Sequence, residues 1–316
     1  MISVVIPCYN AADDVGNAIR SVLQQTRDDY IREVIVVNDG STDRSEGIIR
    51  RWERKDKRIQ YIYQENSGPS AARNTGIDRS SQEYIAFLDA DDCWLERKIE
   101  VQVQFLREHS QVGLLYTDAF RQRLDGETRR IHANHLDFQR EDNLEQLFAK
   151  GGPILTPTVV MKSRCFDKVS GFDSSLPKGQ DSDLWLRTAA EYPVHHLPES
   201  LVLVKTRRGS VASNAEEKVR YLHQITYKLV QMYPRLKKRK SQRKAHLEYY
   251  RGNYLLREGR RHEAMRAFAK SIALDATYWR NYIQMLVACI PVGKRRTQAI
   301  LRVLRRIGSW SRGALS

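Results

Sequence analysis

The first ninety residues of the chain alternate between short apolar segments and predicted helices, and this alternation constrains the fold more than any other feature. The apolar segments have the length and composition of buried strands, and they lie at residues 2–10, 33–37, 59–63 and 84–89. Strands that alternate with helices form a parallel sheet with helices on both faces. The sequence therefore predicts an α/β fold.

Polar side chains lie at the carboxyl ends of three of these four predicted strands. They are Tyr9 and Asn10, then Asn38 and Asp39, and finally Asp89, Asp91 and Asp92. In open α/β sheets, ligands bind beyond the carboxyl ends of the strands. We therefore expect a binding site at this edge of the sheet.

The three carboxylates after the fourth strand are typical of a site for a hard divalent cation. Crowded carboxylates raise one another's cost of ionisation. A Mg²⁺ or Mn²⁺ ion removes that cost, and it prefers oxygen ligands together with substrate phosphates. An alternative is an acidic turn that ends the strand, with Asp92 capping the next helix.

Five segments, taken in order, carry a family resemblance. They read Ile6-Pro-Cys-Tyr-Asn10, Val36-Val-Asn-Asp-Gly-Ser-Thr-Asp43, Gly68-Pro-Ser-Ala-Ala-Arg-Asn-Thr-Gly76, Phe87-Leu-Asp-Ala-Asp-Asp92 and Gly179-Gln-Asp-Ser-Asp-Leu-Trp-Leu-Arg187. Over about residues 1–213 the chain resembles the family 2 glycosyltransferases of the GT-A fold, of the bacterial cell-surface polysaccharide type. The resemblance implies an inverting, metal-dependent transfer of a sugar from a nucleotide-diphosphate sugar, which we expect to be a UDP-sugar. It implies a hydroxyl of a glycan or lipid-linked glycan as acceptor.

The resemblance also assigns roles to single residues. Asp91 becomes the principal ligand of Mn²⁺ or Mg²⁺, and Asp181 becomes the general base that takes the acceptor's proton. Asp39 is placed against the base, commonly uracil, and Asp89 on the ribose or on the water shell of the metal. Asn38 and Gln180 stand where many relatives have a second acidic residue.

The remaining donor contacts rest on the same resemblance. Pro7 and Tyr9 are expected to complete the base pocket. Arg73 is expected to reach the diphosphate, or alternatively to bind back to Asp89. Arg208 lies in a closing loop where many relatives have a metal-binding histidine, and it is expected to clamp the diphosphate.

Two side chains close in sequence to the general base Asp181 are expected to have structural roles. We expect Asp183 to cap a helix over residues 183–190, so that Asp181 lies in the loop before it. We expect Trp185 to pack in the core.

Charge divides the chain into two parts. Residues 216–316 hold 24 Lys and Arg against 6 Asp and Glu, whereas residues 1–215 hold 29 against 32. We therefore predict a GT-A domain over residues 1–215 and a basic helical region over residues 216–316. Within that region, four residues resemble one tetratricopeptide-like helical hairpin: Gly252, Gly259, Ala264 and Phe268.

The C-terminal residues 297–312 have the pattern of a basic amphipathic helix. Its predicted apolar face consists of Ile300, Val303, Leu304, Ile307 and Trp310. Such a helix suits the surface of an anionic membrane. The alternative is that this face docks on the protein's own helices.

Other features of the sequence bear on where the protein lies in the cell and on its alternative functions. The four cysteines lack metal spacing, and the longest apolar run is too short to span a membrane. We expect no signal peptide, because no basic segment precedes the first apolar run. We expect a cytoplasmic protein, with peripheral contact to the inner face of the plasma membrane and no nucleic-acid partner. The competing hypotheses are a nucleotidyltransferase and an inactive nucleotide-sugar-binding protein of the same fold.

Overall fold

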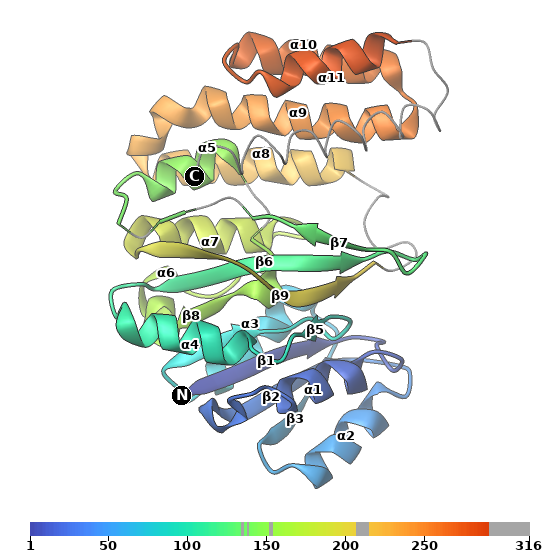
Figure 1. Ribbon diagram of the computed structural model, residues 1–316, viewed down its shortest axis with the longest axis vertical. Helices are drawn as coiled ribbons and strands as arrows, with labels where there is room; N and C mark the ends of the chain where they lie inside the picture. The colour runs from blue at the N-terminus through green and yellow to red at the C-terminus, as the bar shows by residue number, and fades with distance from the viewer. Residues whose placement is uncertain (134–135, 138, 152–153, 207–214, 291–316) are drawn as a thin grey trace. The chain divides into compact units, whose positions relative to one another are not determined.

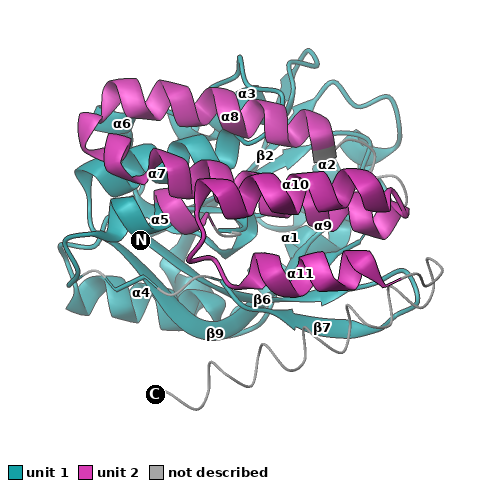
Figure 2. Ribbon diagram, turned by 90° about the horizontal axis from the view of Figure 1, so that it is seen from above, with its two compact units in different colours: residues 1–147, 152–210 teal, residues 148–151, 211–316 magenta. Residues whose placement is uncertain are grey.

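The computed structural model describes residues 1–133, 136–137, 139–151, 154–206 and 215–290. The chain divides into two compact units, coloured separately in Figure 2. The first consists of residues 1–147 and 152–210, and the second of residues 148–151 and 211–316.

One mixed sheet of nine strands forms the centre of the first unit, as far as the structure describes it. The strands are β1 (Ile2–Cys8), β2 (Ile31–Asp39), β3 (Ile59–Gln64), β4 (Tyr84–Phe87), β5 (Cys93–Trp94), β6 (Leu114–Gln122), β7 (Thr128–Ile131), β8 (Val160–Lys162) and β9 (Val194–Lys205). Their order is β3-β2-β1-β4-β8-β6-β9-β5, and β7 pairs with β6.

The four strands that the sequence predicts are neighbours in this sheet. Figure 1 labels three of them, β1, β2 and β3. β3, β2, β1 and β4 run parallel, while β8 pairs antiparallel with both β4 and β6. The observed ends of these four strands differ from the predicted ones by no more than two residues. Because the strands are parallel, the polar residues that follow β1, β2 and β4 come to the same edge.

Helices cover both faces of the sheet. They are α1 (Val15–Leu23), α2 (Ser45–Lys55), α3 (Pro69–Arg79), α4 (Lys98–Glu108), α6 (Phe166–Val169) and α7 (Gln180–Glu191). A further helix, α5 (Asn143–Lys150), contains the boundary between the two units, which falls after Leu147. Successive residues of a strand point to opposite faces. In β1, Val4 and Ile6 join a core cluster with residues of α1, α2 and α4, whereas Val5 lies against α3.

α3 packs unusually close to β1 because it carries a glycine at the contact. A Cβ at Gly76 would lie 2.3 Å from Cγ1 of Val5, a side chain that is fully buried. Only a residue without a side chain fits there, so Gly76 sets the distance between helix and sheet.

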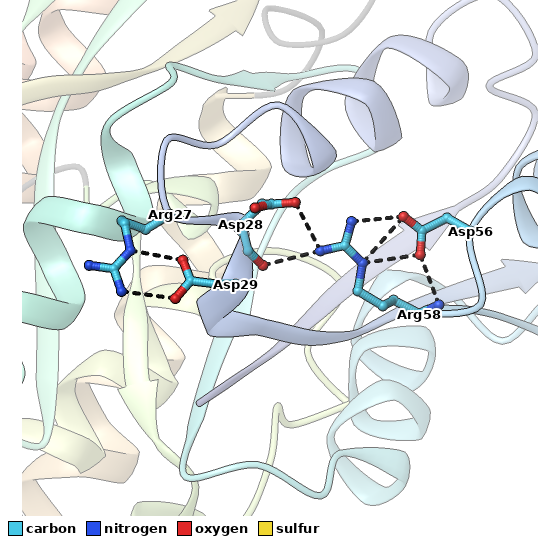
Figure 3. Close-up of polar contacts among 5 residues, drawn as sticks. All are labelled: Arg27, Asp28, Asp29, Asp56 and Arg58. Atoms are coloured by element: carbon cyan, nitrogen blue, oxygen red, sulfur yellow. Dashed lines mark hydrogen bonds and ion pairs between the residues drawn. The ribbon is translucent and has the colours of Figure 1, made fainter.

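Ion pairs join the turns that lead into β2 and β3 (Figure 3). Arg58 donates to the carboxylate of Asp56 and to both the carbonyl and the carboxylate of Asp28. Nearby, Arg27 donates two hydrogen bonds to Asp29. These pairs lie at the amino ends of the strands, opposite the edge that carries the motifs. They are exposed enough for solvent to screen them, so they add little stability.

The second unit is helical. Its helices are α8 (Ala215–Met232), α9 (Lys240–Glu258), α10 (Arg261–Leu274) and α11 (Arg280–Cys289). α9 ends at Gly259 in the left-handed conformation, with φ of 83°. Gly252 lies against the ring of Phe268, which is buried together with Ala264. These contacts form the helical hairpin expected at these four positions.

Across the described residues, no helix is both long enough and apolar enough to cross a membrane.

Gly76→Ala should lower the free energy of unfolding by about 1–3 kcal/mol, because the new methyl group overpacks the contact with Val5. Urea unfolding measures the change. The matched control is Gly47→Ala in α2, where a Cβ would meet nothing within 4 Å. There we expect a gain of about 0.5–1 kcal/mol from helix propensity. Equal effects at the two positions would contradict the packing argument.

Candidate active site

A cavity of about 300 Å³ opens where β1, β2 and β4 end. Six of the residues expected to bind the donor and the metal line it: Pro7, Tyr9, Asp39, Arg73, Asp89 and Asp91. They come from four separate segments of the sequence, and the parallel strands bring those segments together. The structure therefore gathers at one cavity most of the site residues that the sequence singled out.

Four further residues, to which the sequence analysis assigned no role, line the cavity. Asn66, Gly68, Pro69 and Ala72 line it from the turn before α3 and from α3 itself. The Gly-Pro pair at the start of α3 was a usable signal, since proline is favoured in the first helical turn. Cys8 lines the cavity as well, and burial raises the pKa of its thiol to about 11. That thiol is therefore protonated at neutral pH and is no nucleophile.

Asp39 organises the turn that forms one side of the cavity. Its Oδ1 accepts hydrogen bonds from Nε2 of Gln64 at 2.7 Å and from the backbone N–H of Ser67 at 2.9 Å. Its Oδ2 accepts the backbone N–H of Gly68 at 2.9 Å. The carboxylate is almost completely buried. Three donors thus fix its orientation toward the cavity.

The loops that follow β1 and β2 are bonded to each other. Asn10, which has a positive φ of 46°, accepts the backbone N–H of Thr42 at 2.8 Å and donates its own N–H to Ser41. Asp43 accepts the N–H of Ala12 at 3.0 Å. Tyr9 precedes this junction, and its side chain is about half exposed. A ring held there is available to a planar base.

Gly40 permits the close approach of the second loop. Its φ is +71°, and a Cβ would lie 2.8 Å from the backbone nitrogen of Asn66. Any other residue at position 40 would therefore strain the backbone and clash with Asn66.

Arg73 binds back to Asp89. Its Nη2 donates to Oδ1 of Asp89 at 2.6 Å, and its guanidinium lies 5.3 Å from the ring centre of Phe172. The sequence left two alternatives for this arginine, and the ion pair with Asp89 is the one present in the structure. Because Arg73 also lines the cavity, the pair forms part of its wall.

Asp92 does not cap a helix, contrary to the alternative considered from the sequence. The next helix, α4, begins only at Lys98, and β5 intervenes. Instead, Oδ1 of Asp92 accepts the backbone N–H of Lys205 at the end of β9, at 2.9 Å. The side chain of Lys205 in turn binds Asp14 at 3.1 Å. Asp92 therefore ties the acidic turn to the last strand, while Asp91 lines the cavity.

Asn74, next to Arg73, connects α3 to the segment before α7. Its Nδ2 donates to the carbonyl of Phe172, and its Oδ1 accepts the N–H of the same residue, both at 2.8 Å. Gly171 makes room for this contact, since a Cβ there would lie 2.3 Å from Oδ1 of Asn74. Two adjacent residues of α3 thus hold Asp89 and Phe172.

Two expectations about α7 were wrong. The helix begins at Gln180, so Asp181 lies in its first turn and not in a preceding loop. Asp183 does not cap it, because its buried carboxylate accepts from Nε of Arg187 at 2.8 Å. Arg187 also donates to the carbonyls of Val169 and Gly171. The i,i+4 spacing of an acid and an arginine was the signal for this pair.

Asp181 itself does not line the cavity. It accepts the N–H of the next residue, Ser182, at 2.7 Å. Trp185, one turn along, is buried as expected, and its indole N–H donates to the carbonyl of Ile154.

The charges of the cavity are suited to a bound cation. Three carboxylates and one guanidinium line it, and the guanidinium is already paired with Asp89. Within the described residues, no group of three or more His, Cys, Asp or Glu side chains is arranged to hold a metal. What the cavity offers is the carboxylate oxygens of Asp89 and Asp91, the donor type of a Mg²⁺ or Mn²⁺ ion that takes one or two carboxylates and completes its shell with substrate phosphates.

Two sequence predictions lie outside the described residues. They are the diphosphate contact of Arg208 and the amphipathic helix of residues 297–312.

Comparison with known proteins identifies the family. The model of glycosyl transferase family 2 matches residues 3–166, slightly more than half of the chain. The chain belongs to the family 2 glycosyltransferases. One relative is the putative teichuronic acid biosynthesis glycosyltransferase TuaG of Bacillus subtilis, 41% identical over 111 residues, which are 35% of this chain and 43% of TuaG. This transferase spans only 29% to 43% of the lengths of the first curated relatives.

Two solved structures share the fold. TarS 1–349 from S. aureus, in complex with UDP-GlcNAc, has a TM-score of 0.62 and 17% identity, with 95% of this transferase and 91% of TarS 1–349 covered. The mannosyltransferase PcManGT from Pyrobaculum calidifontis, in complex with GDP-Man and Mn²⁺, has a TM-score of 0.61 and 19% identity, with coverage of 91% and 83%. The predicted α/β fold of the GT-A type is confirmed.

Asn74→Ala should lower the free energy of unfolding by about 1–3 kcal/mol, because it leaves the buried N–H and carbonyl of Phe172 without partners. Urea unfolding measures this change too. Asn17→Ala, at an exposed position of α1, is the control and should stay within about 0.5 kcal/mol of the wild type. If the two variants behave alike, Asn74 does not hold the segment before α7.

Proposed function

We propose that this transferase moves a sugar from a UDP-sugar to a hydroxyl of a glycan or lipid-linked glycan, with inversion at the sugar carbon. The observation that carries the proposal is the single cavity lined by Asp39, Arg73, Asp89 and Asp91. The complexes of TarS with UDP-GlcNAc and of PcManGT with GDP-Man support a nucleotide-sugar donor. Hydrolysis of a panel of UDP- and GDP-sugars tests it, because an inactive binding protein would hydrolyse none of them.

The hydrogen bonds of Asp39 favour uracil over guanine. A carboxylate has about four acceptor positions. Oδ1 already accepts two hydrogen bonds and Oδ2 one. The position left on Oδ2 suits the single ring N–H of uracil. Guanine presents two adjacent donor groups, and these would require an acceptor position on each oxygen. The ring of Tyr9 and the edge of Pro7 complete the proposed base pocket.

Asp91 is the proposed ligand of Mn²⁺ or Mg²⁺. Bound there, the cation would stabilise the negative charge of the departing diphosphate. Asp89 is the proposed contact to the ribose or to the water shell of the metal, and its bond to Arg73 keeps it in place. Arg208 is the proposed clamp on the diphosphate. The Mn²⁺ in the PcManGT complex supports a metal-dependent site of this kind.

Asp181 is the proposed general base. It lies in the first turn of α7, and the segment before this helix is bonded to α3 through Asn74 and Phe172. This connection links the acceptor side of the proposed site to the helix that carries Arg73. A carboxylate there would accept the proton of the attacking hydroxyl as the bond to the sugar forms.

We further propose residues 1–215 as the transferase domain and residues 216–316 as a separate helical region. The charge division of the sequence supports this boundary. The proposed location is the cytoplasm, at the inner face of the plasma membrane, where lipid-linked acceptors are found. The name of the relative TuaG, in teichuronic acid biosynthesis, supports a polysaccharide acceptor.

Asp91→Asn should reduce transfer and donor hydrolysis about a thousandfold while leaving the fold intact, because it removes one charge from the cation site. In calorimetry, UDP binding should lose its dependence on Mn²⁺. The control is Asp78→Asn, an exposed aspartate of α3, which should behave as the wild type. Near wild-type turnover of the Asp91 variant would remove Asp91 from the metal site.

Asp181→Asn should lower kcat by about a hundredfold or more, the usual scale for the loss of a general base. Affinity for UDP should hardly change, since the residue does not line the cavity. Glu191→Gln, at the exposed end of the same helix, serves as control. Loss of UDP affinity with kcat retained would assign Asp181 to donor binding and not to catalysis.

A further inference from the structure

α11 carries a row of exposed apolar side chains. Trp279, Tyr282, Leu286 and Ile290 are 53%, 45%, 68% and 42% exposed. They are spaced three and four residues apart, from the residue before α11 to the residue after it, so they share one side of the helix. We call these four residues the α11 surface. Single exposed apolar residues are common on proteins, but a contiguous row marks an interaction site.

The opposite side of α11 is buried, and this fixes the direction in which the exposed row faces. There, Asn281, Gln284, Val287 and Ala288 are buried, and the last two belong to a core cluster with residues of α9 and α10. Arg261 of α10 donates to the carbonyls of Val287 and Ala288. The α11 surface therefore cannot rotate into this core, and any cover for it must come from outside the α9–α11 packing.

Charge indicates what kind of partner covers the surface. From Ala276 to Ser316 the sequence contains eight Lys and Arg and no Asp or Glu. One of these residues, Arg280, lies 5.7 Å from the ring centre of Trp279. Because each copy is strongly positive here, a second copy of the chain would be repelled. An apolar row that includes Trp and Tyr, within a basic segment, is typical of a surface that binds an anionic bilayer.

We propose that the α11 surface docks on an anionic phospholipid bilayer. Trp279 and Tyr282 would lie at the boundary between headgroups and acyl chains, where amphipathic rings are favoured. Leu286 and Ile290 would extend the apolar contact, and Arg280, beside the ring of Trp279, would bind a headgroup. This docking does not depend on the reaction that the first unit catalyses, nor on a helix at residues 297–312.

The first experiment is vesicle flotation with the full chain. The vesicles contain phosphatidylcholine with or without phosphatidylglycerol. We expect binding only with phosphatidylglycerol, and binding that weakens as salt is added. The triple variant W279S/Y282S/L286S should bind at least tenfold more weakly while keeping its helical circular dichroism. Leu124→Ser, at a residue 62% exposed in the turn between β6 and β7, is the control and should bind as the wild type. No binding by the wild type, or equal binding by the triple variant, would overturn the proposal.

The second experiment tests whether lipid, and not another part of the protein or a second copy, contacts the α11 surface. In a Trp310→Phe background, brominated phospholipid should quench the fluorescence of Trp279, and the further change Trp279→Phe should remove that quenching. If the protein binds vesicles and Trp279 stays unquenched, the chain's own C-terminal residues cover the surface and the proposal is wrong. It is also wrong if truncation after Pro291 abolishes binding that the triple variant keeps. Light scattering completes the test, since dissociation of a dimer by the triple variant without loss of vesicle binding would indicate a second copy as the partner.

Discussion

The close contact between α3 and β1 is the constraint on which the candidate active site depends. Without a Cβ at Gly76, the helix lies directly on Val5. Three and two residues before Gly76, Arg73 binds Asp89 and Asn74 binds Phe172. A displaced α3 would move both contacts at once. The absence of one side chain in a helix therefore sets the position of the acidic strand end and of the segment before α7.

Much of the fold and of the cavity could be predicted because the signals are local. Apolar segments mark the strands, and polar residues at their carboxyl ends must meet at one edge once the strands run parallel. That Asp39, Asp89 and Asp91 lie at the cavity could be predicted from their position at the end of a strand. The charge difference between residues 1–215 and 216–316 is likewise visible in the sequence alone.

The rest could not be predicted because it depends on partners far apart in the chain. Asn74 and Phe172 are separated by 98 positions, and Asp92 and Lys205 by 113. No periodicity connects such residues, so Asp92 was considered as a helix cap although it holds the last strand. Asp183 is a different case, because its partner Arg187 is only four residues away. There the spacing was available, and the expectation of a cap overlooked it.

The four cysteines differ in how readily their thiols react with reagents in solution. Cys8 and Cys165 are buried, and burial raises the pKa of their thiols to about 11 and about 12. Burial raises the pKa of the partly buried Cys93 as well. Cys289, the last residue of α11, is exposed. Because the thiolate is the reactive form, alkylating reagents and oxidants will select Cys289. The chain thus carries a natural attachment point for a spectroscopic label beside the α11 surface, while the thiol in the cavity stays unmodified.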